Sequence, residues 1–147
     1  RRTGELLAEG ARRGRPVSVV VFGADPAPDP GEGPKSRLGS DLALALGAHA
    51  RASDAVGRLG EGWVGIAAPT TDAERARRLA ERLLDTVERH LARSRRPAPR
   101  LSAGYHSVAD PGSDAGDAAA LIARAVTALR TRTADGRIRP WAGDAVA

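Results

Sequence analysis

The sequence predicts an α/β domain in which helices cover one face of a mixed central sheet. The run over residues 17–22 is continuous and β-branched, which is typical of a strand buried on both of its faces. Residues 73–91 repeat alanine, leucine and valine at helical spacing, which predicts a helix with one apolar face. Segments with these two kinds of pattern alternate along 147 residues, a length sufficient for one hydrophobic core.

The first half of the chain contains three predicted elements and one long loop. Residues 1–14 have the pattern of the end of a helix, which Gly14 terminates. The strand over residues 17–22 follows. Residues 23–36 contain four prolines and three glycines, a density that excludes a regular element. Helical spacing resumes over residues 38–49.

The second half begins with a predicted hairpin, in which strands over residues 54–59 and 63–67 are joined by a turn at residues 60–62. A capping box then opens the helix over residues 73–91, with Thr71 at the N-cap and Glu74 at the third helical position. The remaining predicted elements are a strand over residues 101–108, a helix over residues 118–129 and a short strand over residues 136–140.

Composition excludes several classes of protein. Cysteine is absent, so disulfides, thiolate catalysis and cysteine-based metal sites are excluded. No apolar run approaches the ~20 residues of a membrane span, so we expect a cytoplasmic domain without membrane contact. The three histidines lie on three different predicted elements, so we expect no metal site from them. Methionine is also absent, and we therefore expect the chain to be a piece of a longer protein.

The chain is strongly basic, with a formal net charge of +5, and 22 of its 23 basic residues are arginine. Proteins that bind single-stranded nucleic acid expose several aromatic residues among basic ones. The four aromatic residues here are scattered, so we expect no nucleic-acid partner, whereas a phosphate-rich ligand remains compatible with the charge. Arg75, Arg77 and Arg78 would form either a phosphate-binding patch or a solvated helix face, and the solvated face is the favoured interpretation.

Several fragments, in their order along the chain, resemble the GGDEF domain, which is the catalytic domain of diguanylate cyclases. They are VSVVVFGAD, RASDAVGRLGEGWVGIAAP, AERL, LSAGYHSV and ALRTRTADGRIR. The resemblance covers residues 1–140 as one domain whose opening helix is truncated, and it leaves residues 141–147 as a tail. It implies a nucleotidyl-cyclase-like fold, and a chemistry in which two facing domains join two GTP molecules into cyclic di-GMP. Two Mg²⁺ ions held by carboxylates assist that reaction in the family.

At the positions that hold these metals in the family, the sequence has no carboxylates. The acid after the first strand falls on Gly23, and the acid in the third position of the hairpin signature falls on Gly62. Trp63 takes the fourth, normally acidic position, where its indole should fill the old nucleotide pocket. The resemblance therefore implies a degenerate domain without cyclase activity, metal or cofactor. Residual activity would need Glu61 or Asp25 as a substitute ligand.

Parts of the family's GTP pocket remain. Asp25 and Asp41 match family aspartates, and Asp41 corresponds to the one that reads guanine. Arg137 matches a family arginine, whereas a nearby phosphate-binding lysine of the family falls on Thr133. Under the resemblance, Asp25, Asp41, Trp63 and Arg137 thus form a vestigial nucleotide pocket, in which GTP could bind without turnover.

A second family site, at which many GGDEF domains bind their own product, also has counterparts here. Its signature Arg-x-x-Asp, five residues before the hairpin motif, is matched by Arg51 and Asp54, and a further family arginine aligns with Arg82. Arginine can bond guanine O6 and N7 together, and a carboxylate can accept from the guanine N1–H and amino groups. The pattern occurs three times in this arginine-rich chain, so only its register distinguishes this copy.

The leading hypothesis is therefore a bacterial signalling module that binds cyclic di-GMP through Arg51, Asp54 and Arg82. Occupancy would be reported to other domains of a longer protein, or to a second copy in a homodimer. One alternative is an interaction scaffold that binds no nucleotide. Another is a domain that retains GTP in the vestigial pocket.

Overall fold

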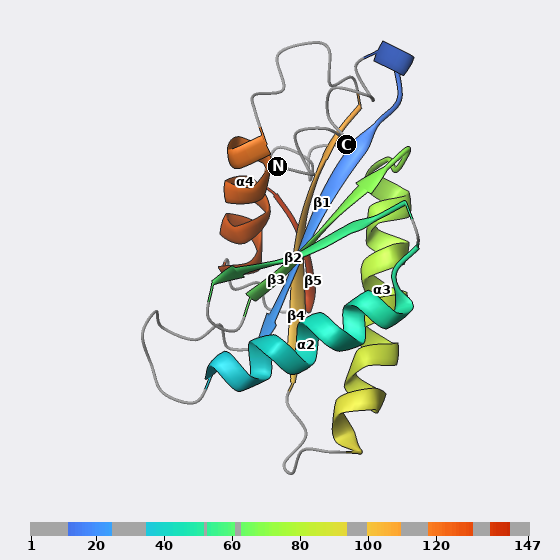
Figure 1. Cartoon of the computed structure of the whole chain (residues 1–147). Coiled ribbons are helices and arrows are strands. Elements are labelled where there is room, and N and C mark those ends of the chain that lie inside the picture. The colour runs from blue at the N-terminus through green and yellow to red at the C-terminus, as the bar shows by residue number, and fades with distance from the viewer. Residues whose placement is uncertain are drawn as a thin grey trace.

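The computed structural model describes the regular elements and several of the turns between them (Figure 1). Five strands and three full helices lie within the described ranges. These ranges are residues 12–24, 35–51, 53–60, 63–93, 100–109, 118–130 and 136–141, with the side chains of residues 35–38 and 60 excepted.

The strands form one mixed sheet with β1 at its centre. They are β1 (Val17–Ala24), β2 (Ala55–Gly60), β3 (Trp63–Pro69), β4 (Leu101–Val108) and β5 (Ile138–Pro140). Their order across the sheet is β2-β3-β1-β4-β5. β1 pairs antiparallel with both β3 and β4, whereas β4 and β5 run parallel. The central position of β1 explains its continuous apolar run, because a central strand covered on both faces needs apolar side chains on both.

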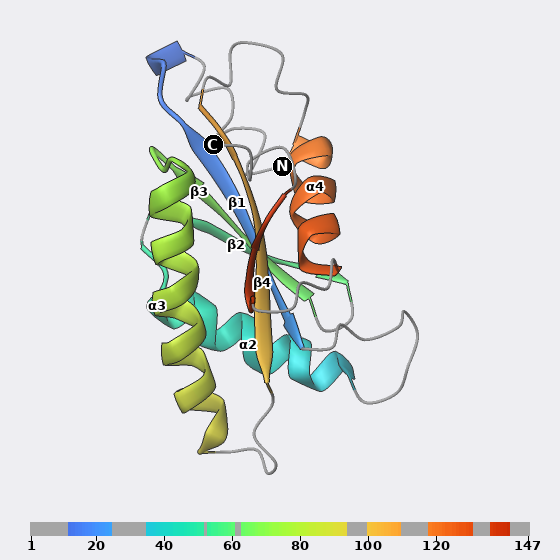
Figure 2. The same ribbon diagram turned by 180° about the vertical axis from the view of Figure 1, so that it is seen from behind.

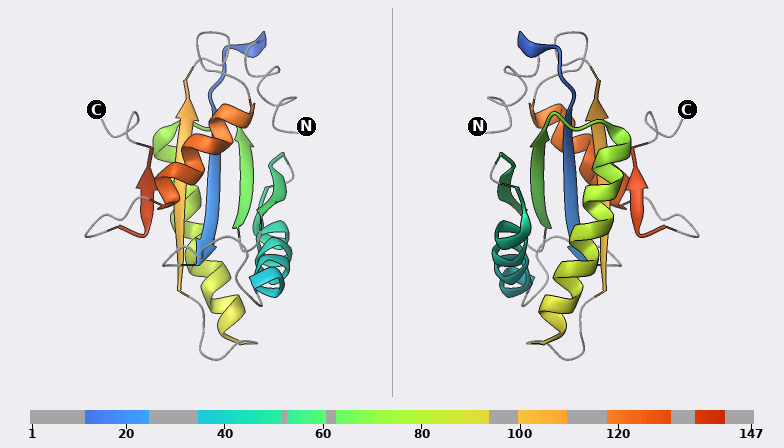
Figure 3. Two further views of the ribbon diagram at one scale, coloured as in Figure 1. Left: turned by 90° about the vertical axis from the view of Figure 1, so that its left-hand side faces the viewer. Right: turned by 90° about the vertical axis from the view of Figure 1, so that its right-hand side faces the viewer.

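Helices cover both faces of this sheet, which corrects the expectation that they cover one face only. α2 (Lys35–His49) and α3 (Ala73–Ala92) pack on one face, and α4 (Ala118–Arg130) packs on the other (Figure 3). On the shared face, α2 runs crosswise to α3 (Figure 2). The molecule is therefore a three-layer arrangement with the sheet in the middle.

The alternation of side chains along β1 gives the physical reason for the two covered faces. Val20 and Phe22 point to one side and join the core beneath α2 and α3. Val19 and Val21 point to the other side and join a smaller core beneath α4. All four side chains are almost completely buried, so neither face of β1 could have been left to solvent without a large loss of hydrophobic stabilisation.

The first turn of α3 also corrects a prediction, which placed Thr71 at the N-cap and Glu74 at the third helical position. Asp72 caps the helix instead, and its side chain accepts a hydrogen bond of 2.9 Å from the Arg75 backbone N–H. Thr71 is buried, and its hydroxyl donates to the Pro69 carbonyl at 2.8 Å. The Thr71 hydroxyl is thus directed back toward β3 and is not available to the helix N-terminus.

The predicted helix end before β1 is confirmed where the structure describes it. Residues 12 and 13 are helical, and Gly14 follows with a φ angle of 62°, a left-handed conformation that commonly ends helices. Residues 1–11 and the proline-rich residues 25–34 lie outside the described ranges. In the part of the chain that is described, no helix combines the length and apolar character needed to cross a membrane.

Candidate functional site

An open hollow lies beside the N-terminal half of α3 and has a volume of about 290 Å³. Two of the residues predicted from sequence, Arg51 and Arg82, both line it, although 30 positions separate them in the chain. Two further arginines complete a basic wall. The full lining is Arg51, Thr71, Arg75, Arg78, Leu79 and Arg82. We call this feature the arginine hollow.

Arg51 and Asp54 form a close ion pair at the edge of the arginine hollow. The Arg51 Nη2 atom lies 3.1 Å from Asp54 Oδ1, and the Nε atom lies 3.3 Å from the same oxygen. The Arg51 backbone N–H also donates to Asp54 Oδ2 at 3.0 Å. The Asp54 side chain is 0% exposed, whereas 47% of the Arg51 side chain is exposed. The Asp54 carboxylate therefore accepts hydrogen bonds from Arg51 and is not accessible to solvent. The guanidinium of Arg51 is the part of the pair that solvent or a ligand can reach.

Thr71 supplies a third contact to the same guanidinium. Its Oγ1 atom accepts a hydrogen bond of 2.9 Å from Arg51 Nη2. A guanidinium carries five N–H groups, one on Nε and two on each terminal nitrogen. Asp54 and Thr71 together use the Nε group and the Nη2 groups, while Nη1 has no partner among the described residues.

Arg82 lies where the end of α2 approaches α3. Its Nη1 atom donates to the carbonyl of His49, the last residue of α2, at 3.3 Å. A cation near the C-terminal carbonyls of a helix is electrostatically favourable. Arg82 therefore has a structural role as well as a place in the wall of the arginine hollow.

Arg75 and Arg78 were interpreted from sequence as part of a solvated helix face, yet both line the arginine hollow. Residues 75, 78 and 82 are spaced by three and four positions, so one face of α3 presents all three. This helical spacing is the sequence pattern that could have indicated Arg75 and Arg78 as neighbours of Arg82 in the site. Arg77 faces another way and lines a different hollow.

The electrostatic balance of the arginine hollow favours an anion. Asp54 pairs with Arg51, and Glu74 pairs with Arg78 at 2.9 Å. Within the described part of the chain, no carboxylate pairs with Arg75 or Arg82. Among the described residues, two of the four arginines are therefore in no ion pair, which favours the attraction of a phosphate.

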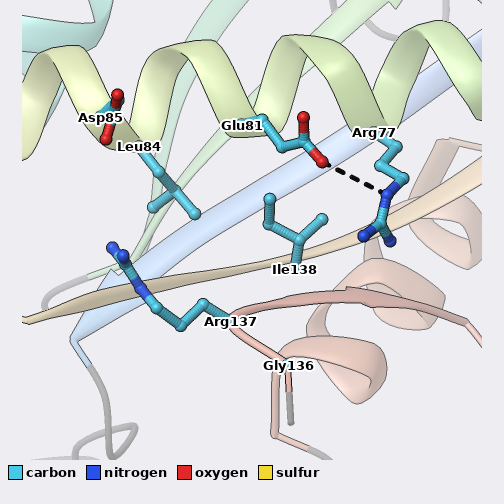
Figure 4. Close-up of a pocket in the computed structure, with 7 residues that line it drawn as sticks. All are labelled: Arg77, Glu81, Leu84, Asp85, Gly136, Arg137 and Ile138. Atoms are coloured by element: carbon cyan, nitrogen blue, oxygen red, sulfur yellow. Dashed lines mark ion pairs between the residues drawn. The ribbon is translucent and has the colours of Figure 1, made fainter.

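A second hollow, of about 380 Å³, lies between α3 and β5 (Figure 4). Its arginines are neutralised, because Arg77 pairs with Glu81 at 3.3 Å and Arg137 pairs with Glu88. Arg137 also donates from Nε to the Leu101 carbonyl at 2.9 Å. The second hollow consequently has no excess of positive charge to offer a phosphate, and the arginine hollow is the better candidate site.

Of the four residues predicted from sequence to form a vestigial nucleotide pocket, the structure describes Asp41, Trp63 and Arg137. Arg137 faces α3, whereas Trp63 packs with the core beneath α4 on the opposite face of the sheet. Asp41 is half-buried on α2. Asp25 and Gly62 lie outside the described ranges, so their part of the prediction is not tested.

Trp63 and Gly23 are in direct apposition. A Cβ atom added at Gly23 would lie 2.7 Å from Trp63 Cδ1, which is closer than side chains pack, and 3.3 Å from Leu129 Cδ2, which is a tight contact. The indole Nε1 atom is buried and has no hydrogen-bond partner among the described residues. The indole therefore occupies the space next to residue 23, where the resemblance places a metal-binding carboxylate. No cluster of three potential metal ligands occurs in the described part of the chain.

No protein-family model matches the sequence, and no curated protein sequence matches it either. Solved structures do match in fold. The GGDEF domain of DgcB from Caulobacter crescentus, determined in complex with c-di-GMP, has a TM-score of 0.68 and 18% identity, over 95% of this chain and 84% of that chain. The active GGEEF domain of a diguanylate cyclase from Vibrio cholerae has a TM-score of 0.66 and 21% identity, over 95% of this chain and 91% of that chain.

A third similar structure is the GGDEF domain of PA1120 from Pseudomonas aeruginosa, with a TM-score of 0.68 and 18% identity, over 95% of this chain and 91% of that chain. At these identities the likeness concerns the backbone. It establishes that the chain has the fold of GGDEF domains, with the five-stranded mixed sheet and its covering helices in common.

Proposed function

We propose that this chain is a degenerate GGDEF-type regulatory domain that binds cyclic di-GMP in the arginine hollow and does not synthesise it. The observation that supports the proposal most directly is the convergence of Arg51 and Arg82 on one hollow. Their roles were inferred from register alone, on separate elements. Arg75 and Arg78 add positive charge beside them. The structure of DgcB, which has this fold, contains c-di-GMP.

The chemistry of the ligand suits the arginine hollow. Cyclic di-GMP carries two phosphates and two guanines, and arginine binds phosphate through charge-assisted hydrogen bonds and stacks on base planes. A volume of about 290 Å³ lies just below the range of about 300–1,000 Å³ that is typical of small-molecule sites. The hollow would therefore hold one part of the ligand, and the rest would remain exposed to a second surface.

The absence of synthesis rests on Gly23 and Trp63. Two-metal phosphoryl chemistry needs carboxylate ligands to fix the cations. Glycine supplies none at residue 23, and the indole of Trp63 already occupies the adjoining space. Restoring an acid at residue 23 would first require removal of the indole.

The test is calorimetric titration of the chain with cyclic di-GMP. We expect binding at micromolar or lower concentration, and a loss of at least about tenfold in Arg51→Ala and in Arg82→Ala, because each removes a charge-assisted contact. Arg89→Ala is the matched control, since Arg89 lies exposed on the same helix outside the lining and bonds only the Asp85 carbonyl among the described residues. Arg89→Ala should bind as the unaltered chain does.

Titration with GTP and Mg²⁺, followed by analysis of the products, separates the alternatives. Heat from GTP that is lost in Asp41→Ala would favour a retained GTP pocket. Formation of cyclic di-GMP would overturn the proposed inactivity. No heat from either nucleotide would overturn the binding proposal and leave the fold as an interaction scaffold.

A further inference from the structure

The Thr71 hydroxyl is buried next to Arg51, and its hydrogen bonds fix which partner receives its proton. Thr71 is 1% exposed. A hydroxyl has one proton to donate and lone pairs with which to accept. The proton of Thr71 is directed at the Pro69 carbonyl, 2.8 Å from Oγ1. A lone pair of the same oxygen therefore faces Arg51 Nη2, which lies 2.9 Å away.

Thr71 itself is anchored to the central strand and to the segment before it. Its backbone N–H donates to the Pro16 carbonyl at 3.1 Å. Its carbonyl accepts a hydrogen bond of 2.7 Å from the hydroxyl of Ser18, a fully buried residue of β1. The preceding Thr70 has a φ angle of 52°, a left-handed conformation that is rare for a β-branched residue. Such a conformation persists only where the surrounding contacts impose it, and here those contacts set the place of the Thr71 hydroxyl.

The position of the Thr71 hydroxyl determines which N–H groups of Arg51 remain available to a ligand. Asp54 and Thr71 hold the guanidinium from two sides, through Nε and Nη2. The two N–H groups of Nη1 are the ones left for a ligand in the arginine hollow. A ligand would thus meet a guanidinium whose direction is already fixed, and would not have to immobilise a free arginine side chain on binding.

We propose that Thr71 is a positioning residue of the arginine hollow, and that its hydroxyl orients Arg51 toward the ligand. This inference rests on the proposed function of the hollow as a site for cyclic di-GMP. Thr71 acts through Arg51 and needs no contact of its own with the ligand. The two N–H groups of Nη1 can donate to one or two acceptor atoms of the ligand, for which phosphate oxygens are the best match in charge.

The test compares cyclic di-GMP affinity in Thr71→Val and Thr71→Ser. Valine keeps the shape of threonine but removes the hydroxyl, so we expect roughly three- to tenfold weaker binding, the effect of freeing one long side chain. Serine keeps the hydroxyl, so the affinity of Thr71→Ser for cyclic di-GMP should be within about twofold of that of the unaltered chain. In the Arg51→Ala background Thr71→Val should have no further effect, whereas in the Arg82→Ala background its full effect should remain, because Thr71 contacts Arg51 and not Arg82.

Two outcomes separate this inference from the proposed function. If the unaltered chain binds and Arg51→Ala does not, but Thr71→Val binds normally, the positioning role is wrong and the binding site stands. If the effect of Thr71→Val is the same with and without Arg51, its role is merely structural and the inference is overturned.

A measurement on the unaltered chain covers the case in which Thr71→Val does not fold or no ligand binds. The Nη2 N–H signals of Arg51, observed by NMR, should exchange slowly with water and show restricted motion, because Thr71 and Asp54 accept from them. The Nη signals of Arg89 should exchange faster, since Arg89 is exposed and bonds one carbonyl, through Nε, among the described residues. Equal exchange at Arg51 and Arg89 would overturn the positioning role whatever the result of the titrations.

Discussion

Among single residues, Asp54 is the one whose role changes most once its surroundings are known. A carboxylate in this position was expected to accept hydrogen bonds from guanine. Its side chain is instead fully buried beneath Arg51, with which it makes its side-chain contacts. Under the proposed function, Asp54 would act on a ligand through the direction of Arg51, because its carboxylate holds that guanidinium in place. Removal of Asp54 would leave Arg51 free to rotate and would alter the site without removing a direct contact.

The apposition of Gly23 and Trp63 gives a prediction on stability. Gly23→Ala should destabilise the chain by about 1–3 kcal/mol, because the new methyl group would overlap the indole ring. In a Trp63→Ala background the same substitution should have little effect, since the space next to residue 23 is then open. Urea denaturation of the two single variants and the double variant measures the coupling.

An equal loss of stability from Gly23→Ala in both backgrounds would contradict this reading of the pair. It would mean that the penalty comes from the backbone at residue 23 or from Leu129, the other near neighbour. If the coupling free energy between the two substitutions is close to the full loss of stability from Gly23→Ala, the indole lies directly next to residue 23 in solution.

At the scale of elements, α3 organises the arginine hollow. Its first turn is fixed by the Asp72 cap and by the Thr71 hydrogen bonds to the strands beneath it. Its apolar face is held against the sheet by buried alanine, leucine and valine side chains. The residues at helical spacing along its exposed side then meet Arg51, which follows the end of α2. A shift of α3 by one turn would separate these groups.

The contact between α4 and β4 provides a prediction at the same scale. A Cβ atom at Gly104 of β4 would overlap the backbone of α4 at Ala125 and Leu129. Backbone atoms cannot be displaced as a flexible side chain can, so Gly104→Ala should cost about 3 kcal/mol or more, at the upper end of single-substitution effects. Thermal or urea unfolding measures the loss.

Gly57 of β2 is the matched control, because no heavy atom lies within 4 Å of a Cβ placed there. Gly57→Ala should leave the free energy of unfolding unchanged or raise it slightly, since alanine restricts the unfolded chain. If the two substitutions have similar effects, α4 does not approach β4 as closely as the structure indicates.

For the whole molecule, the net charge and the order of the layers both favour the approach of an anionic ligand to the arginine hollow. The chain carries a formal net charge of +5, and the arginine hollow contains two guanidinium groups without a carboxylate partner among the described residues. The hollow opens at the end of the layer formed by α2 and α3, away from the core beneath α4. An anionic ligand would therefore be attracted both by the molecule as a whole and by the site itself.

This electrostatic contribution predicts a dependence on salt. Raising the sodium chloride concentration from about 0.05 M to about 0.5 M should weaken cyclic di-GMP binding by roughly tenfold, because the screening length shortens to a few ångströms. A double variant, Arg75→Ala with Arg78→Ala, should bind more weakly at low salt and show a flatter dependence. Affinity that does not change with salt would contradict the assignment of the hollow as a phosphate site.

The sequence by itself determined the nature and bounds of most elements, because the patterns that define them are local. The β-branched run of β1 and the apolar stripe of α3 can each be recognised within one segment. It also indicated Arg51 and Arg82 as candidate binding residues, because their positions relative to the hairpin resemble those in GGDEF domains. It could not show that helices cover both faces of the sheet, since nothing local to the sequence of α4 records which side of β1 that helix meets.

Only the tertiary structure decided what surrounds each site residue. It brought Arg75 and Arg78 to the same hollow as Arg51, buried the Asp54 carboxylate, and separated Trp63 and Arg137 onto opposite faces of the sheet. It also placed the Thr71 hydroxyl under Arg51, where a capping role had been expected. Each of these facts depends on contacts between segments distant in the chain. Such contacts are set by the packing of helices on the sheet, and a one-dimensional pattern does not contain that packing.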